Sequence, residues 1–112
     1  MKRVIIAAAL AVLAGSVPAA AQGVTVSCTD IETMRSPTRG APARLVVKNE
    51  RTSDVELKVV RNNGSEISLG SVKGKSDREI TTRLRYLFAI YEGGNCLMGV
   101  RITNPVVNIL VK

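Results

Sequence analysis

From position 24 onward, apolar and polar residues alternate in short runs, and turn residues separate the runs about every ten positions. In the clearest run, Val55, Leu57 and Val59 alternate with charged residues. A period of two residues is typical of a β-strand with one buried face. No segment keeps an apolar period of 3.6 residues over three turns, so we expect an all-β fold.

The pattern predicts one domain over residues 22–112, an antiparallel, immunoglobulin-like or transthyretin-like β-sandwich of about seven or eight short strands. An Asn63-Gly64 turn of type I′ is expected between the third and fourth strands, with Ile67 and Leu69 of the fourth strand pointing inward. One helical turn is expected near Ile31–Met34. The expected strands are Val24–Cys28, Ala43–Glu50, Val55–Arg61, Glu66–Gly70, Arg78–Arg83, Tyr86–Tyr91, Leu97–Thr103 and Val106–Val111.

The first 21 residues have the features of a cleaved secretory signal peptide. Lys2 and Arg3 form a positively charged start, Val4–Ala14 is apolar, and Ala19–Ala21 supplies the small residues that signal peptidases accept. The apolar run is shorter than the roughly 20 residues that a membrane-spanning helix needs. We therefore expect cleavage before Gln22, no transmembrane span afterwards, and a periplasmic or secreted location.

Cys28 and Cys96 are the only cysteines of the chain. An even number of cysteines in an exported protein indicates an oxidised pair. The sequence has no C-x-x-C motif and no histidine that would activate a thiolate, which argues against a redox or catalytic thiol. We therefore predict a structural disulfide between the two.

The stretch from Val46 to Ile80 resembles small exported bacterial β-sandwich domains of uncharacterised function. The resemblance implies a β-sandwich in the cell envelope, and it carries over no functional residue. The chain departs from the pattern in its cysteine pair and in a shortened connection between Arg83 and Tyr86. The matching residues are Val47, Asn49, Asp54, Val55, Val60, Arg61, Gly64, Leu69, Gly70, Val72 and Arg78.

The residue types argue against catalysis. Histidine, the commonest general base and zinc ligand, is absent from the whole sequence. The sequence also contains no P-loop, no G-x-S-x-G and no dinucleotide-binding fingerprint. We therefore expect no enzyme activity, no cofactor and no metal.

Two sets of residues leave small-ligand alternatives open. The pairs Asp30/Glu32 and Asp54/Glu56 have a spacing that puts both carboxylates on one strand face, which would suit a weak calcium site. A solvated face beside lysine and arginine is the favoured interpretation. The aromatic residues Tyr86, Phe88 and Tyr91 are expected in the core, with a sugar-binding platform as the alternative.

The charge balance is basic. Loss of Lys2 and Arg3 with the signal peptide lowers the formal net charge from +7 to +5. Such a balance keeps a small β-protein soluble and protects its sheet edges. The alternative is one cationic patch for an anionic glycan or lipid headgroup, formed by Lys73, Lys75, Arg78, Arg83, Arg85 and Arg101. Export makes nucleic acid an unsuitable partner.

The leading hypothesis is a non-enzymatic interaction or structural module of the bacterial cell envelope. It would contact an envelope protein through a sheet face or an edge strand, and Val106, Asn108 and Leu110 of the last strand are the expected contacts. The first alternative is the anion-binding module described above. A further alternative is an inhibitor of an envelope enzyme, with Arg35–Pro37 or Gly93–Asn95 as its reactive loop.

Overall fold

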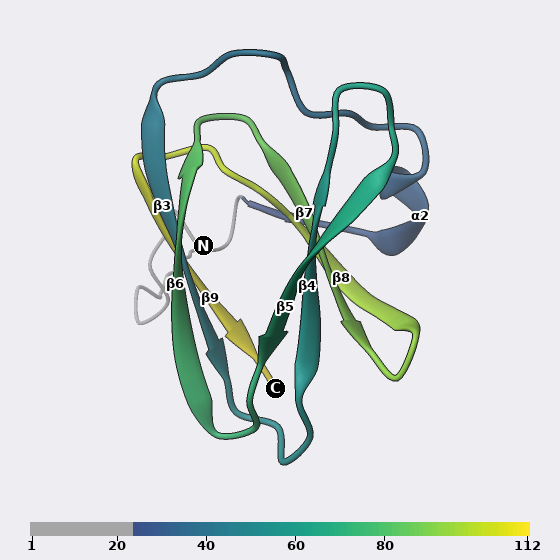
Figure 1. Ribbon diagram of the computed structural model, residues 1–112, viewed down its shortest axis with the longest axis vertical. Coiled ribbons are helices and arrows are strands. Elements are labelled where there is room, and N and C mark those ends of the chain that lie inside the picture. Colours follow the sequence, from purple (N-terminus) through teal and green to yellow (C-terminus); the bar gives the residue numbers. More distant parts are fainter. Residues whose placement is uncertain (1–23) are drawn as a thin grey trace, which may run out of the picture.

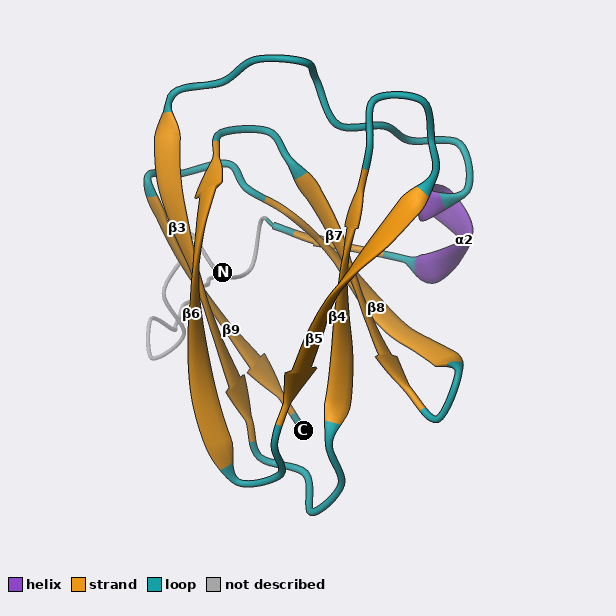
Figure 2. Cartoon of the chain, viewed as in Figure 1, coloured by secondary structure: helices purple, strands orange, loops and turns teal. Residues whose placement is uncertain are grey.

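The computed structural model describes residues 24–112, which form eight strands and one short helix (Figures 1 and 2). The predicted all-β fold is confirmed. The expected signal peptide over residues 1–21 lies outside the described residues. The elements are β2 (Thr25–Val26), α2 (Cys28–Ile31), β3 (Pro42–Asn49), β4 (Val55–Val60), β5 (Glu66–Val72), β6 (Ser76–Arg83), β7 (Leu87–Glu92), β8 (Asn95–Arg101) and β9 (Val106–Val111).

The strands form two facing sheets. One sheet has five strands in the order β2-β8-β7-β4-β5, and the other has three strands in the order β6-β3-β9. All neighbours pair antiparallel except β3 and β9, which run parallel. The interior between the sheets is filled by alternating residues such as Leu45 and Val47 of β3, Leu57 of β4, and Phe88 and Ile90 of β7.

The central strand β7 is apolar on both faces because each face is covered. Phe88 and Ile90 pack between the sheets, while Leu87 and Ala89 form a second, smaller core with Ile31 of α2. Burial on both faces explains why this strand lacks the alternation of apolar and polar residues seen in β4 and β9.

The N-terminal segment differs from the prediction. The first strand ends at Val26, and Cys28 begins a helix, where a strand was expected over Val24–Cys28. Ser27 is the reason, because its hydroxyl accepts a hydrogen bond from the Asp30 N–H at 3.1 Å and caps the helix start. The predicted disulfide between Cys28 and Cys96 is confirmed, and it ties α2 to β8.

The predicted hairpin of β4 and β5 is confirmed, but its turn is of another type. The Gly64 N–H donates to the Arg61 carbonyl at 3.0 Å, and the Arg61 N–H donates to the Ser65 carbonyl at 2.7 Å. Of the turn residues only Gly64 has a positive φ, +90°, whereas type I′ needs positive φ at both central residues. The expected type I′ turn is therefore wrong, and a loop one residue longer replaces it. Asn63 stabilises this loop by accepting the Ser65 N–H at 2.9 Å.

Strand β5 is poorly covered. Both Ile67 and Leu69 were expected to point into the core. Leu69 is half-buried, but Ile67 is 44% exposed, so the prediction is wrong for Ile67. Ile67 pairs with Val59, which packs against the main core but is itself only partly buried. The sandwich is therefore incompletely closed along this edge.

Asn49, at the end of β3, holds the following turn in place. Its side chain is 1% exposed and donates to the carbonyls of Ser53, at 2.9 Å, and Val72, at 3.0 Å. Its amide oxygen accepts the Arg51 N–H at 2.9 Å. The asparagine singled out in the sequence is therefore a buried link between the two sheets.

Candidate functional site

The first candidate site is the free edge of β9. Among the strands of residues 24–112, β9 pairs with β3 alone, and the ladder runs from Arg44↔Val106 to Asn49↔Val111. The Pro105 and Val111 carbonyls accept backbone N–H groups of the β3 side, both at 2.8 Å. Backbone direction alternates along a strand, so residues 107, 109 and 111 face β3 and residues 106, 108 and 110 turn their N–H and C=O groups outward.

The same three residues also expose their side chains. Val106 is 40% and Leu110 is 41% exposed, and Asn108 between them is exposed too. The alternating residues Val107 and Ile109 are buried in the core. The structure therefore brings the three sequence-predicted contact residues together on one sheet edge, with backbone and side chains both accessible.

The other sheet edges within residues 24–112 are blunted. Strand β2 has two residues, and β5 is distorted by a register shift in its pairing with β4 and by a positive φ of +100° at Gly70. Strand β6 carries the charged residues Asp77, Arg78 and Glu79. Charges, bulges and short length are the devices that protect edges from pairing with another chain. Val106–Val111 contains no charge, no proline and no register shift, and no other strand of residues 24–112 covers its outer edge.

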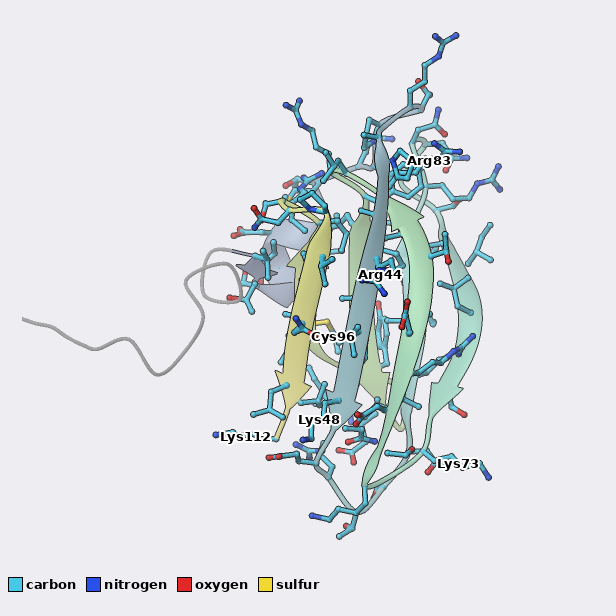
Figure 3. All side chains as sticks on the ribbon, turned by 90° about the vertical axis from the view of Figure 1, so that its left-hand side faces the viewer. Arg44, Lys48, Lys73, Arg83, Cys96 and Lys112 are labelled. Atoms are coloured by element: carbon cyan, nitrogen blue, oxygen red, sulfur yellow. A yellow bond between two sulfur atoms is a disulfide. The ribbon has the colours of Figure 1, made fainter. Side chains whose placement is uncertain are left out.

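The predicted cationic patch is divided between the two ends of the sandwich. Lys73 and Lys75 lie in or beside the turn between β5 and β6, whereas Arg83 ends β6 at the far end (Figure 3). At about 3.3 Å per residue, β6 separates the two groups by roughly 20 Å. Arg78 lies near the lysine end, where its guanidinium faces the Ser71 carbonyl at 3.4 Å.

Arg85 and Arg101 lie with Arg83 at the other end. The Arg101 guanidinium donates to the carbonyls of Arg35, at 3.2 Å, and Arg85, at 2.7 Å. Arg83 donates to the Gly40 carbonyl at 2.9 Å. The shortened connection after β6 is a tight turn, closed by the Tyr86 N–H on the Arg83 carbonyl at 3.2 Å, in which Arg85 takes a φ of +73°.

This arginine-rich end has members that the sequence analysis did not assign to it. Four loop segments meet there, residues 35–41, 61–65, 84–86 and 102–105, and none of these segments contains aspartate or glutamate. Glu32, at the start of the connection to which residues 35–41 belong, lies where its charge acts on Tyr91. Within residues 24–112 the salt bridges are Arg44–Glu79 and Arg51–Glu92, and neither involves this end. The signal in the sequence is that these loop segments lack acidic residues. The topology is needed to recognise that the segments lie at the same end of the sandwich. We call the following residues the arginine end: Arg35, Arg39, Arg61, Arg83, Arg85 and Arg101.

Three carboxylates, those of Glu32, Glu56 and Glu66, lie around Tyr91 on the outer face of the five-stranded sheet. The Tyr91 hydroxyl donates to the Glu66 carboxylate at 2.8 Å, and the Lys58 ammonium lies 4.5 Å from the Tyr91 ring centre. Burial, the hydrogen bond to Glu66 and the charges of Glu66, Glu56 and Glu32 raise the pKa of Tyr91 to about 12. Tyr91 is thus a neutral hydrogen-bond donor within an acidic face.

The aromatic and acidic residues considered for a small ligand are held by contacts within the protein. Phe88 is buried as expected, whereas Tyr86 and Tyr91 are half-buried. Asp54 accepts the Gly74 N–H at 3.0 Å, and Glu56 accepts the Ser68 hydroxyl at 2.6 Å. In the described part of the chain, no three His, Cys, Asp or Glu side chains are grouped as a metal site would require.

Two further findings complete the description. Over residues 24–112, no helix has the length and apolar character needed to span a bilayer. Comparison of the sequence with family models and with curated proteins finds no match.

Proposed function

We propose that this chain is a non-enzymatic, exported interaction module of the cell envelope that binds a partner protein along β9. The partner would add an extended segment to the three-stranded sheet, next to β9. The observation that carries the proposal is the contrast between β9, whose residues 106–111 have no charge, proline or register shift, and the blunted edges of β2, β5 and β6.

The outward backbone groups of Val106, Asn108 and Leu110 would supply the hydrogen bonds. Each of the three residues presents one N–H and one C=O along the free edge. The exposed side chains of Val106 and Leu110 would cover apolar residues of the added strand, and Asn108 would select a polar residue between them.

A periplasmic or secreted location is part of the same proposal. A disulfide in a small domain fits an oxidising compartment, and the predicted signal peptide gives the route of export. The bond fixes the five-stranded sheet and leaves the β9 edge untouched, because Cys28 and Cys96 belong to α2 and β8.

The test is site-specific photo-crosslinking of the full chain in its native envelope. A photoreactive residue at Leu110 should give a discrete adduct, identified by mass spectrometry, that is absent when the same residue replaces Thr81. Thr81 is the matched position, because it is exposed on β6, at the opposite edge of the same sheet.

Two charge variants sharpen the test. Asn108→Lys places on β9 the kind of charge that protects natural edges, and it should abolish the adduct formed from position 110. Thr81→Lys adds the same charge at the other edge and should leave the adduct intact. Equal crosslinking from positions 81 and 110, or an adduct that survives Asn108→Lys, would remove the support for strand addition.

A further inference from the structure

A groove opens between the two sheets on the side away from β9. Strands β5 and β6 belong to opposite sheets, approach each other at the turn that joins them, and diverge toward the arginine end (Figure 1). The groove between them has a volume of about 540 Å³. Its apolar lining is Val59, Leu69, Ile80, Tyr86 and Phe88.

The lining is an unfinished part of the core. Val59, Leu69 and Ile80 pack against the main core but remain only partly buried. The groove therefore leaves aliphatic side chains from both sheets partly exposed to solvent, and each Å² of apolar surface that a ligand covers contributes about 25 cal/mol. The groove thus favours an apolar occupant.

The mouth of the groove is cationic. Arg83 lines the groove directly, and its guanidinium donates one hydrogen bond to the Gly40 carbonyl, which leaves further N–H donors for a ligand. A second hollow of about 330 Å³ shares Val59 and Tyr86 with the groove and reaches Arg61. A carboxylate or phosphate at this mouth would meet arginine donors, and the residues that line the groove and the second hollow include no aspartate or glutamate.

We propose that this groove binds a single-chain anionic amphiphile, such as a fatty carboxylate or an alkyl phosphate. The alkyl chain lies along Val59, Leu69 and Ile80, and the headgroup sits at Arg83. The ligand needs both an alkyl chain and an anionic headgroup. A free polyanion would leave the apolar groove unoccupied, and a neutral apolar molecule would leave the arginines without an ionic partner.

The probe is monomeric dodecyl phosphate, titrated calorimetrically into the mature protein below its critical micelle concentration. Shortening the chain should weaken binding by about fourfold for each methylene that the groove buries fully, from about 0.8 kcal/mol per CH₂. Inorganic phosphate and dodecyl maltoside, which keep only the head charge or only the chain, should both bind at least tenfold more weakly.

Two variants locate the headgroup. Arg83→Gln should weaken dodecyl phosphate binding about tenfold or more, because it removes a charged donor at the mouth. Arg78→Gln is the matched control, because Arg78 lies on the same strand outside the groove, and its affinity should stay within twofold of the wild type. Equal losses in the two variants would refute the assigned position of the headgroup.

Methyl resonances of the unaltered protein locate the chain. Dodecyl phosphate should shift the methyl signals of Leu69 and Ile80 and leave those of Val106 and Leu110 on β9 unchanged. Absence of binding, binding of inorganic phosphate as tight as that of dodecyl phosphate, or shifts confined to β9 would each overturn the proposal. The groove and β9 lie at opposite edges of the three-stranded sheet. The control position Thr81 lines the groove, but an amphiphile crosslinked there adds a far smaller mass than a protein adduct at Leu110, so the two outcomes are distinguishable.

Discussion

Replacement of both cysteines, Cys28→Ser with Cys96→Ser, should lower the free energy of unfolding by about 4 kcal/mol. The two residues are 68 positions apart, and the chain-entropy estimate for a loop of that length gives about this value. A domain of this size has a total stability of roughly 5–10 kcal/mol, so the variant retains about half or less.

The loss arises mainly in the unfolded chain, which the bond otherwise restricts. In the native state, Ile31 of α2 stays packed on Val60 and Leu87 of the second core, and these contacts need no covalent bond. The half-buried cysteine positions also accept serine without creating a large cavity. We therefore expect a folded variant with a lower urea midpoint and a steeper dependence on urea, since the uncrosslinked chain exposes more surface on unfolding.

The assay is urea unfolding followed by far-ultraviolet circular dichroism. Wild-type protein reduced with a phosphine should unfold at the same midpoint as the double serine variant, which separates loss of the bond from effects of serine. A loss below about 1 kcal/mol would refute the reasoning, because the crosslink would then restrict the unfolded chain far less than its length requires.

Two further predictions concern single residues. Asn49→Ala removes three hydrogen bonds of a buried side chain and should cost about 3 kcal/mol in urea unfolding, at about 1 kcal/mol per bond; a loss within experimental error would mean that the turn holds itself. The Tyr91 phenol should ionise near pH 12 in the folded protein, read as the difference in ultraviolet absorbance between wild type and Tyr91→Phe. Because the folded state holds this proton more tightly than the unfolded chain, with its ordinary pKa of about 10, wild-type stability should fall between pH 10 and 12, and the fall should be smaller in Tyr91→Phe. Ionisation of Tyr91 near pH 10 would contradict this.

The strands and the disulfide could be predicted from the sequence because each depends on local signals. Alternation in Val55–Val60 indicates burial on one face, and the Asn-Gly pair indicates a hairpin, even though the predicted turn type was wrong. The helical turn was expected near Ile31–Met34, three residues too late, because Val24, Val26 and Cys28 continue an alternation that the Ser27 cap interrupts.

The candidate sites could be predicted only in part from the sequence, because they depend on which strands become neighbours. The outward set on β9 follows from period two, but its parallel pairing with β3 joins segments about sixty positions apart and leaves no local trace. The arginine end could likewise be recognised only from the topology, since Arg35 and Arg61 lie in two separate loops, whereas Arg83 ends β6.

The parallel pairing of β3 with β9 has a consequence for the order in which the two sheets form. Val107, Ile109 and Val111 of β9 are buried in the main core, and their partner strand lies about sixty positions earlier in the chain. The pairs β4 with β5 and β7 with β8, by contrast, are hairpins of strands that follow one another directly. Because a long-range pairing closes a much larger loop, β9 should dock onto β3 after these hairpins have formed.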